Sequence, residues 1–216
     1  MNLICEYEGE KMTPEELTIF NNGERLIPGI SHGRGEHLRH NASYNFFIKL
    51  IREDSQNKDI SILDLGCGVG WGTKLMAESL PNARITGVDN SNYSLTYAKR
   101  EYSHFRVDYA FLDLSIPNNI SLLNSLYYDY IVSRGVIEHI NNGLELIKDI
   151  KYNNMFILDM PYNEIEGNLH HKIIHITEDN FKTWGNIKFY YESFNGGLIS
   201  EIKQKDTNML MCVCRR

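Results

Sequence analysis

The chain has 216 residues, enough for one α/β domain with a full hydrophobic core but too few for two large domains. Its composition, 42% hydrophobic and 23% charged, is that of an ordinary soluble protein and excludes disordered and fibrous classes. The formal net charge of −6, with no run of lysine or arginine, argues against nucleic-acid binding through bulk electrostatic attraction.

The four cysteines, Cys5, Cys67, Cys212 and Cys214, match neither a zinc-binding spacing nor a disulfide-rich secreted framework. We therefore expect reduced thiols. No stretch is long and apolar enough to span a membrane, and the acidic N-terminus lacks the basic-then-apolar order of a signal peptide. The sequence thus predicts a cytoplasmic protein.

Residues 1–35 form the least regular part of the chain, and we interpret them as an N-terminal extension or lid. Thr13 can cap a short helix that has Pro14 at its first position and acidic residues in its first turn. An amphipathic helix is expected over residues 36–52, because apolar residues recur there at helical spacing. These residues are Leu38, Ala42, Phe46, Phe47, Leu50 and Ile51. Tyr44, Phe46 and Phe47 are assigned to the core rather than to a substrate platform.

Strands and helices alternate through the rest of the chain. The predicted strands are 62–65, 84–89, 109–112, 128–132 and 155–158, followed by two more at 187–194 and 209–214 after a turn at 195–197. The predicted helices are 73–80, 91–102, one marked by Ile137, Ile140, Leu144 and Ile147, and a short one capped by Thr177. This alternation predicts an α/β fold with a doubly wound parallel sheet in one domain, residues 36–216.

A glycine-rich turn follows the first of these strands and predicts a nucleotide site at the start of a helix. Its glycines are Gly66, Gly68 and Gly70, and Trp71 occupies the third glycine position of the dinucleotide fingerprint. The turn also lacks the Gly-Lys-Ser/Thr ending of a phosphate loop. Asp64 would repel a pyrophosphate but attract a ligand that carries an ammonium and a sulfonium group. The sequence therefore favours a cationic nucleoside.

The run Asp64-Leu65-Gly66-Cys67-Gly68-Val69-Gly70 resembles the first motif of class I S-adenosylmethionine-dependent methyltransferases. The likeness extends over residues 36–160 and implies a Rossmann-like sheet of seven strands, in the order 3-2-1-4-5-7-6, that binds S-adenosyl-L-methionine. By this resemblance Asp89 would bind both ribose hydroxyls, and Leu112 with Asp113 would meet the adenine. The full set of implied cofactor residues is Asp64, Gly66, Cys67, Gly68, Gly70, Trp71, Asp89, Asn90, Leu112, Asp113, Ser133 and Arg39.

A narrower resemblance concerns both ends of the chain. Residues 23–29, followed by Glu36-His37-Leu38, are similar to a bacterial and viral subgroup linked to glycan and surface-polysaccharide biosynthesis. It implies Arg39 as the ligand of the methionine carboxylate and a histidine in the loop after the fifth strand, where His170 and His171 lie. The expected acceptor is therefore a hydroxyl on a sugar, a glycan or another small molecule.

Transfer to a hydroxyl requires alignment with the methyl group and removal of the hydroxyl proton, for which histidine is the usual base. The candidates are His139, His170 and His171, which follow the C-terminal ends of the fourth and fifth strands, where ligands of open α/β sheets collect. Glu138 and His139 could contribute to a metal site, but no third ligand stands at a suitable spacing, so no metal is predicted.

Other interpretations stay open at this point. Asp113 could simply form a turn, and each histidine could be structural. The acceptor could be another small molecule or a protein, and a homodimer is left open. Ser133-Arg134-Gly135 stands where many base methyltransferases carry Asn/Asp-Pro-Pro-Tyr, which argues against a nucleic-acid acceptor. A nicotinamide-dependent oxidoreductase and a silent cofactor-binding module are the alternatives from other classes.

Overall fold

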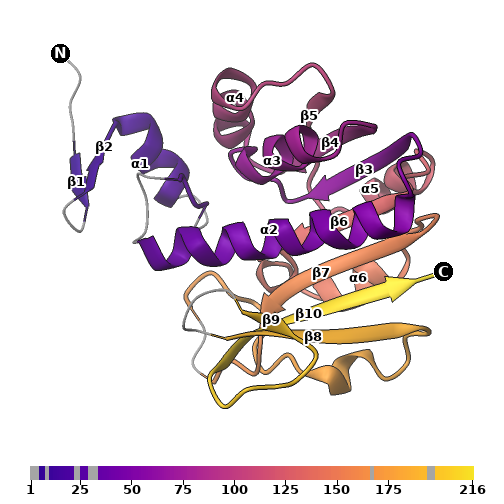
Figure 1. The fold of residues 1–216 in the computed structure, drawn as a ribbon. Helices are drawn as coiled ribbons and strands as arrows, with labels where there is room; N and C mark the ends of the chain where they lie inside the picture. Colours follow the sequence, from indigo (N-terminus) through magenta and orange to yellow (C-terminus); the bar gives the residue numbers. More distant parts are fainter. Residues whose placement is uncertain (1–4, 8–9, 22–24, 29–33, 166–167, 194–197) are drawn as a thin grey trace.

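The computed structural model describes residues 5–7, 10–21, 25–28, 34–165, 168–193 and 198–216. An eight-stranded sheet forms the centre of the molecule, in the order β5-β4-β3-β6-β7-β10-β8-β9 (Figure 1). Its strands are β3 (Ile60–Leu65), β4 (Ala83–Asp89), β5 (Val107–Phe111), β6 (Tyr130–Arg134), β7 (Met155–Pro161), β8 (Ile187–Ser193), β9 (Ile199–Ser200) and β10 (Thr207–Arg215). Neighbours from β5 to β7 pair parallel, and β10 pairs antiparallel with both β7 and β8.

The predicted fold class is confirmed. The seven predicted strands occur in the predicted order, and the structure adds β9, a short eighth strand that pairs with β8 at the sheet edge. The sequence did not reveal β9 because two residues carry no usable periodicity. A further two-stranded hairpin, β1 (Cys5–Tyr7) with β2 (Glu10–Met12), was also not foreseen. The predicted turn at 195–197 lies outside the described residues.

Helices cover both faces of the sheet, as Figure 1 shows. On one face α2 (Arg34–Ser55) and α3 (Trp71–Ser79) share a hydrophobic cluster with the central strands, and α4 (Asn92–Glu101) packs beside them against β4 and β5. On the other face α5 (Pro117–Asn124), α6 (Gly143–Lys148) and the 3-10 segment η2 (Glu178–Phe181) enclose the larger cluster. Burial of these two apolar layers is the main force that holds the sheet between them.

Two helix predictions need correction. The long helix α2 begins at Arg34 and ends at Ser55, and its buried stripe runs through Tyr44, Phe47, Ile48 and Ile51, while Leu38 is 47% exposed. The helix predicted through residues 137–147 is split into the 3-10 turn η1 (Ile137–His139) and α6. Ile140 ends η1 with an extended backbone, and Asn142 precedes α6 in a left-handed conformation with φ +57°, which asparagine tolerates better than most residues.

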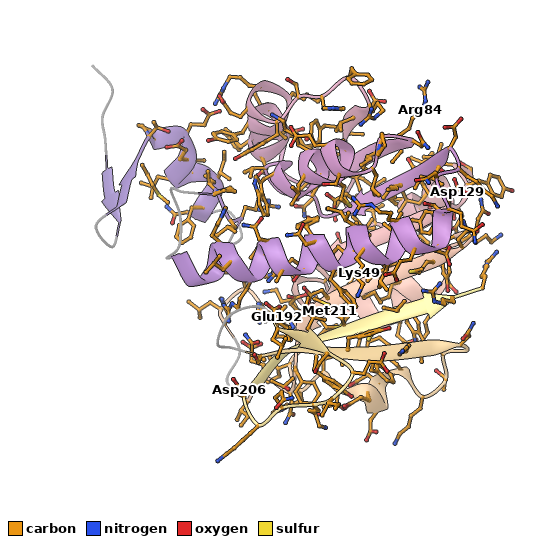
Figure 2. The ribbon with its side chains drawn as sticks, in the orientation of Figure 1. Lys49, Arg84, Asp129, Glu192, Asp206 and Met211 are labelled. Atoms are coloured by element: carbon orange, nitrogen blue, oxygen red, sulfur yellow. The ribbon has the colours of Figure 1, made fainter. Side chains whose placement is uncertain are left out.

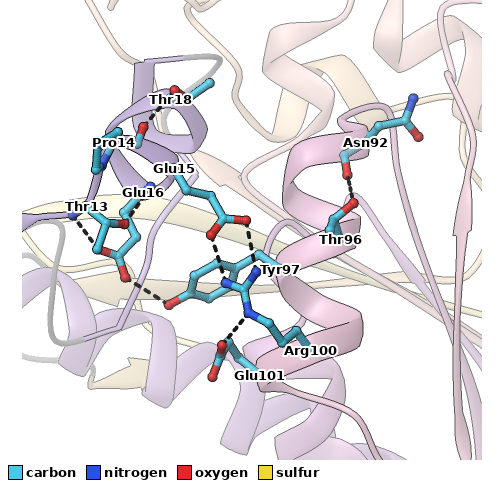
Figure 3. Close-up of polar contacts among 10 residues, drawn as sticks. All are labelled: Thr13, Pro14, Glu15, Glu16, Thr18, Asn92, Thr96, Tyr97, Arg100 and Glu101. Atoms are coloured by element: carbon cyan, nitrogen blue, oxygen red, sulfur yellow. Dashed lines mark hydrogen bonds and ion pairs between the residues drawn. The ribbon is translucent and has the colours of Figure 1, made fainter. Parts of the chain in front are cut away.

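The N-terminal extension is docked on the domain through α1 (Pro14–Asn21) and α4 (Figure 3). Thr13 and Glu16 cap α1 reciprocally, since each backbone N–H donates to the other's side chain, at 2.8 and 3.3 Å. The Tyr97 hydroxyl of α4 donates to Glu16, and the Arg100 guanidinium pairs with Glu15 at 2.9 Å. The predicted cap and first turn of this helix are therefore confirmed.

Candidate active site

A cavity of about 1190 Å³ opens at the C-terminal ends of the parallel strands, the edge where ligands of open α/β sheets bind. Residues just after β3 form one wall, and residues that follow β6 and β7 form another. Arg25 and Leu26 of the N-terminal extension reach its rim. The predicted residues that line it are Arg39, Gly66, Cys67, Gly68, Trp71, Asp89, Asn90, Leu112, Asp113, His139, His170 and His171.

The glycine-rich turn presents bare backbone to this cavity. Gly66 has φ +78°, and a Cβ there would lie 2.2 Å from Val136 Cγ2, so any larger residue would displace the opposite wall. Gly68 has φ +53°, and the nearest atom to a Cβ would be Arg25 Cγ at 4.0 Å. Its N–H donates to Asp89 Oδ2 at 2.9 Å, which ties the turn to the end of β4. The turn is thus fixed to the end of β4 on one side, and its backbone faces the cavity on the other.

Asp89 lies at the cavity but already has several donors. Its Oδ1 accepts from Arg25 Nη2 at 2.9 Å and from the Ser91 N–H at 2.9 Å. The same Arg25 nitrogen donates to Asn90 Oδ1 at 2.6 Å. The Arg25 guanidinium therefore already donates to Asp89, the acid to which the resemblance assigned the ribose hydroxyls. Nothing in the sequence indicated this contact, because Arg25 and Asp89 are far apart along the chain.

Three of the predicted cofactor residues do not line the cavity. Asp64 is 1% exposed and accepts from the Thr73 hydroxyl at 2.5 Å and the Tyr44 hydroxyl at 3.4 Å. Burial raises the pKa of this carboxyl to about 7. Ser133 donates to the Leu65 carbonyl at 3.1 Å, and Gly70 packs against Tyr109. These three residues support the turn and do not line the cavity.

At the end of β5, Leu112 and Asp113 both line the cavity. The Asp113 carboxylate accepts from the Ser115 N–H at 2.9 Å and from the Ser115 hydroxyl at 2.7 Å, which is an Asx turn. The turn-forming role of Asp113 is therefore present in the structure, together with its position at the cavity.

A buried group of charged residues lies under α2, and only one member was predicted from the sequence. Asp159 of β7 accepts from the Ser43 hydroxyl at 2.7 Å and lies 3.3 Å from Arg134 Nε. Glu192 of β8, labelled beside Met211 in Figure 2, lies near this pair, and burial raises its pKa to about 8. Arg39 lies within the electrostatic reach of Asp159 and Glu192, and burial lowers its pKa. Isolated acids inside the apolar strands were the available sequence signal.

The three predicted histidines gather on one wall of the cavity, formed with Glu138 and Glu164, which we name the acceptor-facing wall for the role proposed for it. The His139 and His171 rings meet edge to face, with centroids 4.8 Å apart. His171 Nδ1 lies 2.6 Å from Glu164 Oε2, and His139 Nδ1 lies 3.2 Å from the His170 carbonyl oxygen. Glu138 is 2% exposed, and burial raises its pKa to about 8. The sequence did not indicate Glu164.

A model of the family described as "Methyltransferase domain" matches residues 56–215. The chain belongs to this family. Its structural likeness to the plantazolicin methyltransferase BpumL, solved with a triazolic desmethylPZN analog and SAH, has a TM-score of 0.65 at 17% identity, over 94% of this chain and 92% of that one. The likeness shows the methyltransferase fold, and the family match agrees with the predicted methyltransferase class.

Curated methyltransferase sequences are also similar to this chain. The malonyl-[acyl-carrier protein] O-methyltransferase of Acetivibrio thermocellus is 32% identical over 98 residues, 45% of this chain and 32% of that protein. The enzyme of the same name from Priestia megaterium is 29% identical over 134 residues, 61% of this chain and 44% of that protein. The matched stretches thus span less than half the length of either relative. None of the helices in the described ranges could cross a bilayer.

Proposed function

We propose that this methyltransferase transfers the methyl group of S-adenosyl-L-methionine to a hydroxyl oxygen of a small molecule. When bound, the cofactor supplies an electrophilic methyl group on a sulfonium. The observation that carries the proposal is the acceptor-facing wall, where His171 and His139 reach the cavity with their Nδ1 atoms held by an oxygen. A hydroxyl nucleophile needs such a group, whereas a carboxylate acceptor is already ionised at neutral pH.

We call the part of the cavity beside the glycine-rich turn and Asp89 its cofactor half. One direct observation supports the binding of a nucleoside there. Gly68 leaves its backbone open to the cavity, because within the described part of the chain the nearest atom to a Cβ at this position, apart from its sequence neighbours, would be Arg25 Cγ at 4.0 Å. Asp89 at the end of β4 would accept from the ribose hydroxyls, and Leu112 would pack on the adenine. Arg39 would bind the methionine carboxylate, since it lines the cavity from α2. Asp64 would act only through Thr73 and the turn.

In the acceptor half, the role of Glu164 is to orient His171. An ionised carboxylate accepts the Nδ1–H, so that the lone pair of the neutral ring lies on Nε2 and can take up a proton. The His170 carbonyl fixes the His139 ring in the same way. His170 itself contributes its backbone, and its side chain is exposed.

The proposed acceptors include any small molecule with a reactive hydroxyl, which is a wider class than sugars and glycans. The relatives and neighbours named above act, by their names, on malonyl-[acyl-carrier protein] or plantazolicin, so the sugar acceptor of the narrower resemblance has no support from them. We keep the hydroxyl as the reacting group and treat sugars as one member of the candidate set.

The test is a transfer assay with methyl-labelled S-adenosyl-L-methionine against sugars, phenols, hydroxy acids, dicarboxylic acids and peptides. We expect transfer to at least one hydroxyl compound. His171→Asn should reduce the rate of this transfer by about 10²-fold or more. His175→Asn, an exposed position in the same loop, is the matched control. Transfer to carboxylates alone, with no effect of His171→Asn, would overturn the proposal.

A further inference from the structure

We propose that Glu138, His139 and His171 form a binding site for one divalent transition-metal ion on the acceptor-facing wall. The inference deepens the proposed function and rests on it only for the position of the acceptor. It changes the roles of both imidazoles, because His139 and His171 would bind the ion and Glu164 would orient His171 as a ligand.

The first support is the position of the donor atoms. One ligand atom from each of these three residues lies within 4.8 Å of the other two, which is the spacing of groups that can share a cation. Two of the residues belong to η1, and the third comes from the loop after β7. The sequence showed only the first two, so its prediction of no metal rested on a missing third ligand that the fold supplies.

The loop is attached to η1 by its backbone, which explains why His171 lies there. The Glu138 carbonyl accepts from the Lys172 N–H at 2.7 Å and from the Ile173 N–H at 3.1 Å. These bonds place the residue before Lys172 directly beside Glu138 and His139. Main-chain hydrogen bonds therefore hold His171 beside Glu138 and His139.

The second support is the orientation of both imidazoles. A carbonyl oxygen can only accept, so His139 Nδ1 must be the protonated nitrogen at its 3.2 Å contact with His170. The 2.6 Å contact of His171 Nδ1 with the Glu164 carboxylate fixes the same tautomer. Both rings thus carry their lone pair on Nε2. A carboxylate or carbonyl behind the ligating histidine is the usual support of metal sites.

The third support is the buried carboxylate of Glu138. The residue is only 2% exposed, and its Oε2 accepts no hydrogen bond from the residues that the structure describes. A buried carboxylate oxygen without a donor is costly, and a bound cation removes that cost. The residue lines the cavity, so an ion from solvent can reach it.

The donor set selects the kind of ion. Two imidazoles and one carboxylate suit Zn²⁺, Co²⁺ or Mn²⁺, whereas Mg²⁺ and Ca²⁺ prefer oxygen ligands throughout. Three protein ligands leave further coordination positions open. An ion here would therefore be able to hold the acceptor oxygen at the side of the cavity that faces the glycine-rich turn.

The test measures metal binding directly. Protein treated with EDTA and freed of the chelator is titrated with Zn²⁺, Mn²⁺ and Co²⁺ by calorimetry, and the visible absorption of the Co²⁺ form is recorded. We expect one ion per chain and an absorption band typical of nitrogen and oxygen ligands. Glu138→Gln, His139→Asn and His171→Asn should each weaken binding at least about tenfold, and Glu164→Gln should weaken it about 10- to 100-fold.

His175→Asn is the control, because it changes a histidine of the same loop whose left-handed backbone, φ +59°, asparagine accepts. It should bind the ion as the unaltered protein does. Thermal unfolding without metal checks that each ligand variant is folded, and the ion should raise the midpoint of the unaltered protein but not of the ligand variants. Absence of binding to the unaltered protein, or equal binding by a folded His171→Asn, would overturn the site.

A transfer assay with and without EDTA separates this proposal from the proposed function. Ion binding that depends on these three residues, without transfer to any hydroxyl acceptor, would leave the site standing and remove the function. Hydroxyl transfer that continues unchanged in a protein that binds no ion would overturn the metal site and leave the proposed function standing.

Discussion

Gly68 is the residue at which the backbone of the turn is open to the cavity. Its φ of +53° is a left-handed conformation, which costs an L-residue roughly 1–2 kcal/mol. A side chain there would also enter the open space of the cavity near Arg25, and strain in the turn would disturb the bond from the Gly68 N–H to the Asp89 carboxylate. The position is therefore sensitive for both folding and ligand binding.

We predict that Gly68→Ala weakens binding of S-adenosylhomocysteine by about tenfold or more, an effect of about 1.4 kcal/mol. Calorimetric titration measures the affinity, and thermal unfolding measures the accompanying loss of stability. Gly185→Ala is the control, because a Cβ at Gly185 would meet no atom within 4 Å. Equal affinity of Gly68→Ala and the unaltered protein would show that the turn does not contact the cofactor.

Glu192 predicts how stability depends on pH. Burial raises its pKa from 4.5 to about 8, so the folded state holds its proton at pH values where the unfolded chain has lost it. The contribution of protonated Glu192 to the stability of the folded state is fully present below about pH 4.5 and is lost as the pH rises through about 8.

Glu192→Gln should therefore lose less unfolding free energy than the unaltered protein between pH 5 and pH 8, by about 1–3 kcal/mol. Urea denaturation at both pH values gives the comparison. Glu145→Gln, at a carboxyl whose side chain is 72% exposed, should behave like the unaltered protein. Identical losses in all three proteins would contradict the assigned pKa shift.

At the scale of single residues, all the site residues predicted from the sequence line the cavity except Asp64, Gly70 and Ser133. Asp64 lies on β3 as predicted, and strand alternation turns its side chain toward Thr73 and Tyr44. Which face a strand residue takes depends on register, and the short motif did not contain that information.

At the scale of elements, the N-terminal extension connects α4 to the cofactor side of the cavity. Its helix α1 is fixed to α4 by the Glu15 and Arg100 pair, and Arg25 then crosses to Asp89. If ribose hydroxyls bind Asp89, as proposed, they compete with this guanidinium for Oδ1. The extension would then oppose cofactor binding until Arg25 moves.

We therefore predict that Arg25→Ala tightens binding of S-adenosylhomocysteine by about 3- to 10-fold, about 0.6–1.4 kcal/mol, the strength of a partly exposed ion pair. Arg100→Ala, which removes the pair with Glu15 but leaves Asp89 unchanged, should change the affinity less than about twofold. Weaker binding by Arg25→Ala would instead mean that Arg25 contacts the cofactor itself.

The loop after β7 illustrates what could not be predicted at this scale. Its histidines were predicted as candidates from their place after a strand, but Glu164 was not, and Glu138 was considered only as a metal ligand that lacked a third partner. The bonds that attach the loop to η1 use backbone N–H groups of Lys172 and Ile173, which leave no trace in side-chain patterns. Loops of this kind are set by tertiary contacts, so only the structure could bring the wall together.

At the scale of the whole molecule, the sheet was predictable because each central strand is an apolar run with a helix after it. That pattern gave the fold class and the edge that carries the cavity, whereas the order of the seven strands was implied by the resemblance to class I methyltransferases. The length of α2, the split after η1 and the edge strand β9 depend on packing and on single backbone conformations such as that of Asn142. The same distinction separates the proposed cofactor site, built at the ends of strands, from the proposed acceptor site, built on η1 and a loop.

The central claim is that S-adenosyl-L-methionine binds between the glycine-rich turn and Asp89. Calorimetric titration with S-adenosylhomocysteine and with NADH tests it most directly, on the unaltered protein and on Asp89→Ala. We predict binding of one S-adenosylhomocysteine per chain, a loss of about 10- to 100-fold in Asp89→Ala because charged hydrogen bonds are removed, and no binding of NADH. Binding of NADH in preference, or S-adenosylhomocysteine affinity that Asp89→Ala leaves unchanged, would contradict the account.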